Sequence, residues 1–299
     1  NRTKTKIKGD FMFFVKSEKR KRKENYRKSF ENKFIVEDYY SSDYNEKSDI
    51  DFYTVSWNTP KLVELQIKLF KKFCHGNFKQ IICDNSTDKS AVNEIQNICK
   101  KYDVTYIRVL DKNISYGYSN SHELALNWIW KNIVKSRKQD FAFLDHDLFP
   151  VKDINVKECL GNSPVWGWYY GNAKIWYSWA GFAFFNWNYV KNLPLNFHRY
   201  KLFGFISLKG KYWVDTGSAN WRCLYSKLDK EKVKQCEVHF EDFKTGKVIS
   251  SLNDSNSYCQ YFDHKNWLHI FDGANRQEEQ NTQNRVEELY AILEDKLKE

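Results

Sequence analysis

Residues 141–150 read Phe141-Ala142-Phe143-Leu144-Asp145-His146-Asp147-Leu148-Phe149-Pro150, four apolar residues followed by two carboxylates that stand one residue apart. An apolar run such as Phe141 to Leu144 is typical of a strand inside a parallel sheet, which is buried on both faces. Two acids at the end of a buried strand are costly unless a cation neutralises them. Ligands of open α/β sheets bind at the carboxyl ends of the strands, where a divalent metal ion holding a phosphate would meet that need. A solvated acidic turn has the same short pattern, so the choice depends on the rest of the chain.

Strand and helix patterns alternate regularly from residue 51 to residue 150. Short β-rich runs are separated by segments whose apolar residues recur at helical spacing. Strands are expected at 52–57, 80–83, 104–109 and 141–144, and helices at 62–70, 90–101 and 120–134. This order predicts a mainly parallel, doubly wound (Rossmann-like) α/β sheet flanked by helices.

All four expected strands end in polar residues, which should meet at one edge of the sheet. They are Ser56 and Asn58, then Asp84, Asn85 and Ser86, then Asp111 and Asn113, and finally Asp145 and Asp147. The first strand is followed neither by the glycine-rich fingerprint of dinucleotide-binding proteins nor by the lysine loop of a Walker motif. The sequence therefore predicts a nucleotide crevice in which a metal ion takes the place of a glycine loop.

The positive charge is concentrated at the start of the chain. The net charge is +10, and residues 1–28 hold twelve Lys and Arg against three acids, which leaves the rest close to neutral. We expect residues 1–50 to form a basic, flexible arm, either solvated or attached to an anionic membrane surface or a nucleic acid. A core so close to neutral argues against specific nucleic-acid binding.

The seven cysteines are odd in number and form no CxxC pair, so neither a zinc site of usual spacing nor a complete disulfide framework is expected. Several of them lie in apolar contexts, as Cys83 does, which fits reduced thiols in a reducing compartment. No apolar run is as long as a membrane span, and no signal peptide is evident. These features predict a cytoplasmic protein with peripheral membrane contact at most.

Four motifs in residues 51–150 resemble those of nucleotide-sugar glycosyltransferases of the GT-A fold, closest to family-2-type enzymes. They are Thr54-Val55-Ser56-Trp57-Asn58, Cys83-Asp84-Asn85-Ser86-Thr87-Asp88, Asn113-Ile114-Ser115-Tyr116-Gly117-Tyr118-Ser119-Asn120 and Asp145-His146-Asp147. The last fits the DxD element of that family. The resemblance covers about a third of the chain, and the set of four is more specific than any single motif.

The resemblance implies roles for individual residues. Asp84 would contact a uracil or similar base, Asp145 would face the ribose or phosphate and share the metal, and Asp147 would bind Mn²⁺ or Mg²⁺. The donor would be a nucleotide-sugar, with a UDP-sugar expected. The implied donor-binding set is Thr54, Ser56, Trp57, Asn58, Asp84, Asn85, Asn113, Gly117, Asn120, Asp145 and Arg276.

The second half of the chain is densely aromatic between residues 165 and 189. Most of these rings are expected in a sheet core. Some, near 166–170 or 176–179, could form a platform for an acceptor sugar, because aromatic rings stack on the apolar faces of sugars. Ala180 to Phe185 resembles the strand that follows the DxD element in this fold.

Asp215 follows the short apolar run Tyr212-Trp213-Val214. It suits a helix N-cap or the general base that takes a proton from an acceptor hydroxyl. Glu241 and Asp242 are rival candidates for the base.

The stretch Trp267 to Arg276 resembles the C-terminal loop that closes over the diphosphate in GT-A enzymes. His269 would then be a third metal ligand beside Asp145 and Asp147, and Arg276 would meet phosphate oxygens. Residues 276–299 show apolar positions at helical spacing and predict an amphipathic packing helix. The expected organisation is an arm at 1–50, a catalytic domain at 51–275 with a nucleotide-sugar half (51–150) and an acceptor half (151–275), and the helix at 276–299.

These expectations combine into a metal-dependent glycosyltransferase, a hexosyl- or pentosyltransferase, for which inversion is expected and retention stays an alternative. Its acceptor would be a hydroxyl of a glycan or of a lipid- or protein-linked sugar. One alternative is a nucleotidyltransferase, for which Trp57-Asn58-Thr59-Pro60 is a poor triphosphate loop. The other is a non-catalytic carbohydrate- or nucleic-acid-binding protein on the same fold.

Overall fold

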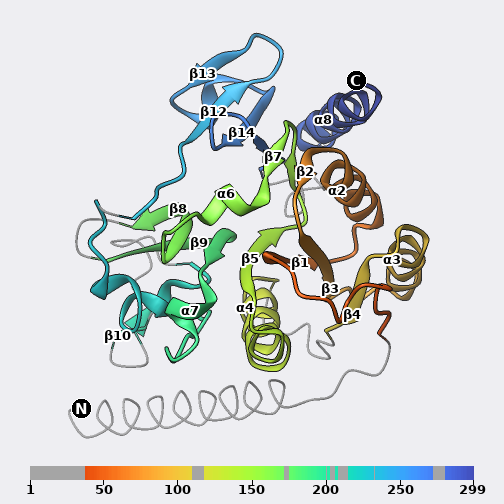
Figure 1. The fold of residues 1–299 in the computed structure, drawn as a ribbon. Coiled ribbons are helices and arrows are strands. Elements are labelled where there is room, and N and C mark those ends of the chain that lie inside the picture. Colours follow the sequence, from red (N-terminus) through yellow and green to blue (C-terminus); the bar gives the residue numbers. More distant parts are fainter. Residues whose placement is uncertain are drawn as a thin grey trace, which may run out of the picture. The chain divides into compact units, whose positions relative to one another are not determined.

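The computed structural model describes residues 38–109, 118–171, 175–199, 201–202, 206–207, 215–231, 233–271 and 280–299 (Figure 1). The basic residues 1–28, and with them the predicted membrane contact, lie outside this part of the chain. Residues 38–50, the last part of the predicted arm, pack on the fold: the backbones of Tyr39 and Tyr106 exchange hydrogen bonds of 2.9 and 2.7 Å. The division of 51–275 into a donor half and an acceptor half stays a prediction.

The central sheet has six strands in the order β4-β3-β1-β5-β9-β8. Its parallel part consists of β4 (Thr105–Arg108), β3 (Phe78–Asp84), β1 (Ile50–Ser56) and β5 (Asp140–Asp145). β9 (Trp176–Phe185) runs antiparallel to β5, and β8 (Val165–Gly171) antiparallel to β9. The prediction of a mainly parallel sheet flanked by helices is confirmed.

Helices cover both faces of this sheet (Figure 1). α2 (Pro60–Phe73), which begins with a proline at its first position, and α3 (Lys89–Tyr102), whose N-cap is Asp88, lie on one face. α4 (Tyr118–Ile129) lies on the other and continues as a π-helical turn (Trp130–Val134) and α5 (Lys135–Arg137). The strands are apolar on both sides because both faces are covered, and β1 is buried at every position.

A second, antiparallel sheet joins the C-terminal part of the chain to the end of β5. Its order is β13 (Lys247–Ile249), β12 (Val238–Asp242), β14 (Tyr258–Phe262), β15 (Trp267–His269) and β6 (Leu148–Pro150). Only His146 and Asp147 separate β5 from β6, so one tight turn connects the two sheets. Because His269 pairs with Leu148 in this sheet, β15 is brought next to that turn.

α8 (Gln280–Lys298) lies within the segment predicted as a C-terminal helix. It buries an apolar stripe against α2 and the second sheet, formed by Val286, Leu289, Tyr290 and Leu293. Short elements complete the described part: β2 (Cys74–His75) with β7 (Ile154–Asn155), β10 (Lys201–Leu202) with β11 (Ile206–Ser207), α6 (Val156–Leu160), α7 (Trp187–Val190), and 3-10 turns at Ser218–Trp221, Tyr225–Lys227 and Leu252–Asp254.

The cysteines form no disulfide, and all seven are free thiols. Burial raises the pKa of the Cys83 and Cys99 thiols, as expected for core positions. Among the described helices, none is both long and apolar enough to cross a membrane.

Candidate functional site

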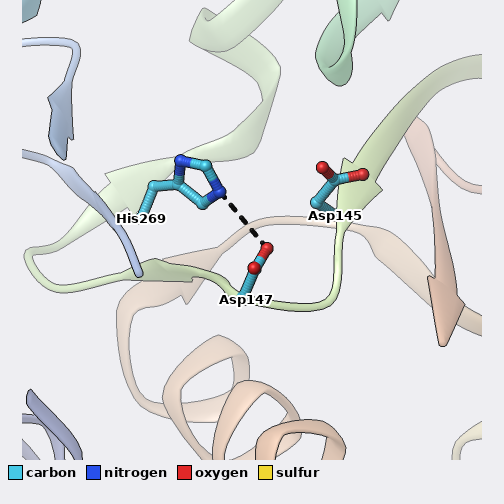
Figure 2. A group of neighbouring side chains, drawn as sticks. All are labelled: Asp145, Asp147 and His269. Carbon is cyan, nitrogen blue, oxygen red and sulfur yellow. Dashed lines mark ion pairs between the residues drawn. The ribbon is translucent and has the colours of Figure 1, made fainter. Parts of the chain in front are cut away.

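The turn between β5 and β6 brings together the three residues predicted to bind a metal. One potential ligand atom from each of Asp145, Asp147 and His269 can be chosen so that all three lie within 4.8 Å of one another. The Nε2 atom of His269 is 3.3 Å from Oδ1 of Asp147 (Figure 2). The two acids come from the end of β5 and the turn after it, and the histidine comes from β15. The geometry agrees with the prediction, and metal binding itself stays a prediction.

Burial and charge make the two acids unequal. The side chains of Asp147 and His269 are 8% and 5% exposed, whereas that of Asp145 is 26% exposed. Burial raises the pKa of the Asp145 carboxyl above its usual value, and the nearby His122 offsets this only in part. Burial acts in the same direction on Asp147, but His269 outweighs it and holds the pKa of Asp147 below its usual value.

His269 is held with its Nε2 atom toward the acids. Its Nδ1 lies 2.8 Å from the side-chain oxygen of Gln260, an acceptor, and this contact is a hydrogen bond in the tautomer that carries the ring proton on Nδ1. In the neutral ring the Nε2 lone pair then faces the Asp147 carboxylate, another acceptor. That contact is favourable only when a proton or a cation lies between the two atoms.

The donor set fits a divalent metal ion. Two carboxylates and one imidazole suit Mn²⁺, and carboxylates also suit Mg²⁺. A hydrogen bond to the far nitrogen of a ligating histidine, as Gln260 makes to His269, is the usual outer contact at such sites. A metal ion held by these three residues would keep further coordination positions, which phosphate oxygens could take.

A glycine and a tryptophan on β9 close one side of the cluster. A Cβ atom added at Gly181 would lie 2.3 Å from Cη2 of Trp179 and 2.6 Å from Oδ2 of Asp145. Only glycine therefore allows the indole and the carboxylate to approach each other here. The Trp179 ring is also 5.2 Å from the His269 ring, centroid to centroid.

Half-buried aromatic rings continue from Trp179 along β8. Trp168 lies 5.6 Å from Trp179, and Tyr170 lies 4.1 Å from Trp168, measured between ring centroids. Tyr170 stacks in turn on Tyr177 at 6.3 Å, and the hydroxyl oxygen of Tyr177 accepts the backbone N–H of Asp215 at 2.7 Å. An aromatic wall (Trp168, Tyr170, Tyr177 and Trp179) thus extends from the Asp145–Asp147–His269 cluster to Asp215.

The polar ends of β1 and β3 also meet at one edge, as predicted. The backbone N–H of Asn85 donates to the carbonyl of Ser56 at 2.9 Å, and that of Asn58 to the hydroxyl of Ser86 at 2.8 Å. The side-chain amide of Asn85 donates to Ser121 at 2.5 Å, while its buried carbonyl oxygen has no hydrogen-bond partner among the described residues. Trp57 and Asn58 are partly exposed at this edge.

Several residues predicted to contact the donor are instead engaged inside the fold. Asp84 is fully buried, and its oxygens accept hydrogen bonds from the backbone of Ser86 at 2.9 Å and from the hydroxyls of Ser56 and Tyr106 at 3.2 and 2.9 Å. Thr54 is fully buried as well. Direct donor contact by the side chains of Thr54 and Ser56 is therefore not supported, because they point into the core, and base recognition by Asp84 stays a prediction.

The side chains of the remaining predicted donor-binding residues are not described by the structure. Asn113, Gly117 and Arg276 lie outside the described residues, and Asn120 is placed in α4 without its side chain.

Asp215 and its two rivals have different surroundings. The Asp215 side chain is 46% exposed, and its Oδ1 is 3.0 Å from the Arg199 guanidinium. Asp242 accepts from the backbones of Lys244 and Thr245 at 3.0 and 2.8 Å and so stabilises the β12–β13 turn. These contacts favour a structural role for Asp242.

Glu241 is 7% exposed and ion-pairs with Lys265. His269 pairs with Gln260, and Gln260 with Phe240, so Glu241, the next residue, faces the opposite side of the second sheet from His269. Of the three candidates, Asp215 is the one that is half-exposed and lies next to the aromatic wall. Its role as the base stays a prediction.

Four residues near the cluster were missed by the sequence interpretation. They are His122 on α4, whose Nε2 is 3.7 Å from Oδ1 of Asp145, together with Gln260, Gly181 and Gln66. Their contacts with the cluster depend on the fold, and no residue type or spacing near them marks these contacts in the sequence.

Comparisons with known proteins give only a distant likeness. No protein-family model and no curated protein matches the chain. Among solved structures, a mannosyltransferase (PcManGT) from Pyrobaculum calidifontis in complex with GDP-Man and Mn²⁺ is 10% identical, with 54% of this chain and 50% of that one covered and a TM-score of 0.33. The apo structure of the bifunctional glycosyltransferase WbbM is 12% identical, with 48% and 32% covered and a TM-score of 0.32. The matches thus span half or less of those chains, and such low TM-scores carry no argument about function.

Proposed function

We propose that this protein is a metal-dependent glycosyltransferase that moves a sugar from a nucleotide-sugar to an acceptor hydroxyl. The observation that carries the proposal is the Asp145–Asp147–His269 cluster at the carboxyl end of a parallel strand. The polar ends of β1 and β3 meet at the same edge of the sheet, the position at which α/β folds bind nucleotides.

The cluster would bind Mn²⁺ or Mg²⁺ through Asp145, Asp147 and His269. A metal ion there would neutralise the charge that develops on the departing nucleoside diphosphate. With its ring proton on Nδ1, donated to Gln260, His269 would direct its Nε2 lone pair at the site, and Trp179 covers one side of the site. The donor side would lie at the edge formed by Trp57, Asn58 and Asn85, and a UDP-sugar is the donor that we favour.

Asp215 would act on the acceptor side. The acceptor oxygen forms a bond to the anomeric carbon while the bond from that carbon to the diphosphate breaks, and the hydroxyl proton passes to Asp215. Attack opposite the leaving group gives inversion. The half-buried rings of Trp168 and Trp179 support a sugar acceptor, whether a glycan or a lipid- or protein-linked sugar, because they offer faces on which pyranose rings stack.

The test measures binding and turnover of a panel of nucleotide-sugars with and without Mn²⁺. Asp147→Asn is expected to abolish metal-dependent binding and transfer. Asp153→Asn, which removes a charge from an acid that is 78% exposed, serves as the matched control and should leave both unchanged. Trp168→Ala should raise the KM for the acceptor and leave donor binding intact. Transfer that survives Asp147→Asn, or the absence of any metal-dependent nucleotide-sugar binding, would refute the proposal.

A further inference from the structure

Gln66 is a fully buried polar residue on α2, within a helix that otherwise buries apolar side chains. A buried amide is tolerated when its donors and acceptors are satisfied. The partners of this amide therefore indicate what it does.

The side-chain nitrogen of Gln66 donates to the backbone carbonyls of Asp145 and Leu148, at 2.9 and 2.8 Å. Its oxygen accepts from the hydroxyl of Thr54 on β1 at 2.9 Å. Because both carbonyls can only accept, the orientation of the amide is fixed. The oxygen then accepts from Thr54 and, at 3.4 Å, also from the side-chain amide of Gln80.

The two carbonyls are the first and last of the turn that carries the metal cluster. The turn begins at Asp145 and ends at Leu148, so the amide group of Gln66 on α2 hydrogen-bonds to both ends of the turn. The turn is tied at two further points: the N–H of Ile270 donates to the carbonyl of Asp147 at 2.9 Å, and Nδ1 of His146 lies 3.0 Å from the carbonyl of Val55. Of these three sets of contacts, the one made by Gln66 bridges both ends of the turn.

We propose that Gln66, oriented by Thr54, is a positioning residue for the metal site. It holds the turn so that Asp145 and Asp147 are presented together before the ion arrives. Ligands that are already held in place lose less freedom when the ion binds. Gln66 touches neither the ion nor a substrate and acts through the turn.

The inference rests on the metal site of the proposed function but not on sugar transfer, so it is tested with Mn²⁺ alone. Free Mn²⁺ is followed by its electron paramagnetic resonance signal during titration of the purified protein. Gln66→Met keeps the side-chain length and removes both donors. It should weaken Mn²⁺ binding by about 10- to 100-fold, the range usual for outer contacts of metal ligands.

Matched variants separate positioning from general stability. Gln96→Met makes the same change at a partly exposed position on α3, where Gln96 accepts from Lys100 at 3.2 Å, and should bind Mn²⁺ as the wild type does. Thr54→Val removes the nearer of the two donors to the Gln66 oxygen, which lie at 2.9 Å (Thr54) and 3.4 Å (Gln80), and should weaken binding. Thr54→Ser restores this donor and should restore affinity. Thermal unfolding without metal shows which variants are folded, and the Thr54 pair decides the question if Gln66→Met does not fold.

The outcomes distinguish this inference from the proposed function. Weakened Mn²⁺ binding in Gln66→Met or Thr54→Val, with rescue in Thr54→Ser, supports the inference even if no sugar transfer is found. Mn²⁺ affinity within twofold of wild type in a folded Gln66→Met protein, or equal affinities in the two Thr54 variants, overturns it while leaving the proposed function in place. A wild-type protein that binds no Mn²⁺ overturns both.

Discussion

Gly181→Ala is the substitution for which the structure gives the sharpest expectation. The added methyl carbon would lie 2.3 and 2.4 Å from two ring carbons of Trp179 and 2.6 Å from Oδ2 of Asp145. Ordinary carbon contacts lie at about 3.5–4.0 Å, so each neighbour would have to move by roughly 1 Å. Overpacking of this kind typically costs about 1–3 kcal/mol of stability.

The two neighbours differ in how easily they can move. The half-buried Trp179 ring packs against Trp168, Phe262 and His269, whereas the Asp145 side chain is 26% exposed and packs against fewer rings. We therefore expect Asp145 to rotate away, which limits the loss of stability to about 1 kcal/mol, the low end of that range. Displacing one ligand of the cluster should weaken Mn²⁺ binding by at least about tenfold, equivalent to about 1.4 kcal/mol.

The assay combines thermal unfolding without metal with Mn²⁺ titration. Gly246→Ala is the matched control, because a Cβ at Gly246 meets nothing within 4 Å while its φ of +71° is unfavourable for alanine. The control should lose about 1 kcal/mol of stability through backbone strain and bind Mn²⁺ normally. If folded Gly181→Ala bound Mn²⁺ within twofold of wild type, the assignment of Asp145 as a ligand pressed against Trp179 would be refuted.

Two further predictions follow from other contacts. Gln260→Leu removes the acceptor of the His269 Nδ1 proton and should weaken Mn²⁺ binding by about 10- to 100-fold. Gln260→Glu keeps an acceptor and should bind Mn²⁺ more tightly than Gln260→Leu. Equal Mn²⁺ titration curves for the two variants would contradict this prediction. For Glu64, burial acts to raise the pKa, but hydrogen bonds from Lys101 and Tyr102 outweigh it and lower the pKa to about 2. A folded-state pKa below the usual 4.5 stabilises the protein above pH 4.5, and that contribution is lost as the pH falls toward 2. Glu64→Gln should therefore lower the Tm at neutral pH, and the Tm of the variant should decrease less than that of the wild type as the pH falls toward 2. Parallel curves of Tm against pH for the two proteins would be inconsistent with the ion pairs.

The parallel half of the sheet could be predicted because its signal is local. A run such as Phe141–Leu144 is apolar throughout because both faces of β5 are covered, and the spacing of helical stripes between such runs fixes the alternation. Because both faces of these strands are covered, the sequence does not indicate toward which face their polar residues point. A strand that is buried on both sides shows no alternation, so the sequence could not indicate that Thr54 and Ser56 point into the core.

The three residues of the cluster could be predicted from the sequence, whereas the residues that support them could not. Asp145 and Asp147 stand in a short motif, and His269 stands in a stretch that resembles a known loop. Gln66 hydrogen-bonds the carbonyls of Asp145 and Leu148, residues 79 and 82 positions away, and nothing near Gln66 in the sequence marks that partnership. Contacts of this kind depend on how α2 packs on β1, which is a property of the whole fold.

The first turns of α4 link the metal cluster to the candidate base. His122 lies 3.7 Å from Asp145, and the next residue, Glu123, lies 3.5 Å from Arg199, which in turn holds Asp215 at 3.0 Å. Glu123 is almost fully buried, so its carboxylate can hold the Arg199 guanidinium in place beside Asp215. The described hydrogen bonds of the Asp215 carboxylate all involve Oδ1. Arg199 would therefore orient the carboxylate through one oxygen and leave Oδ2 to meet an acceptor hydroxyl. In that arrangement one helix would set the positions of both the leaving-group side and the acceptor side of the proposed reaction.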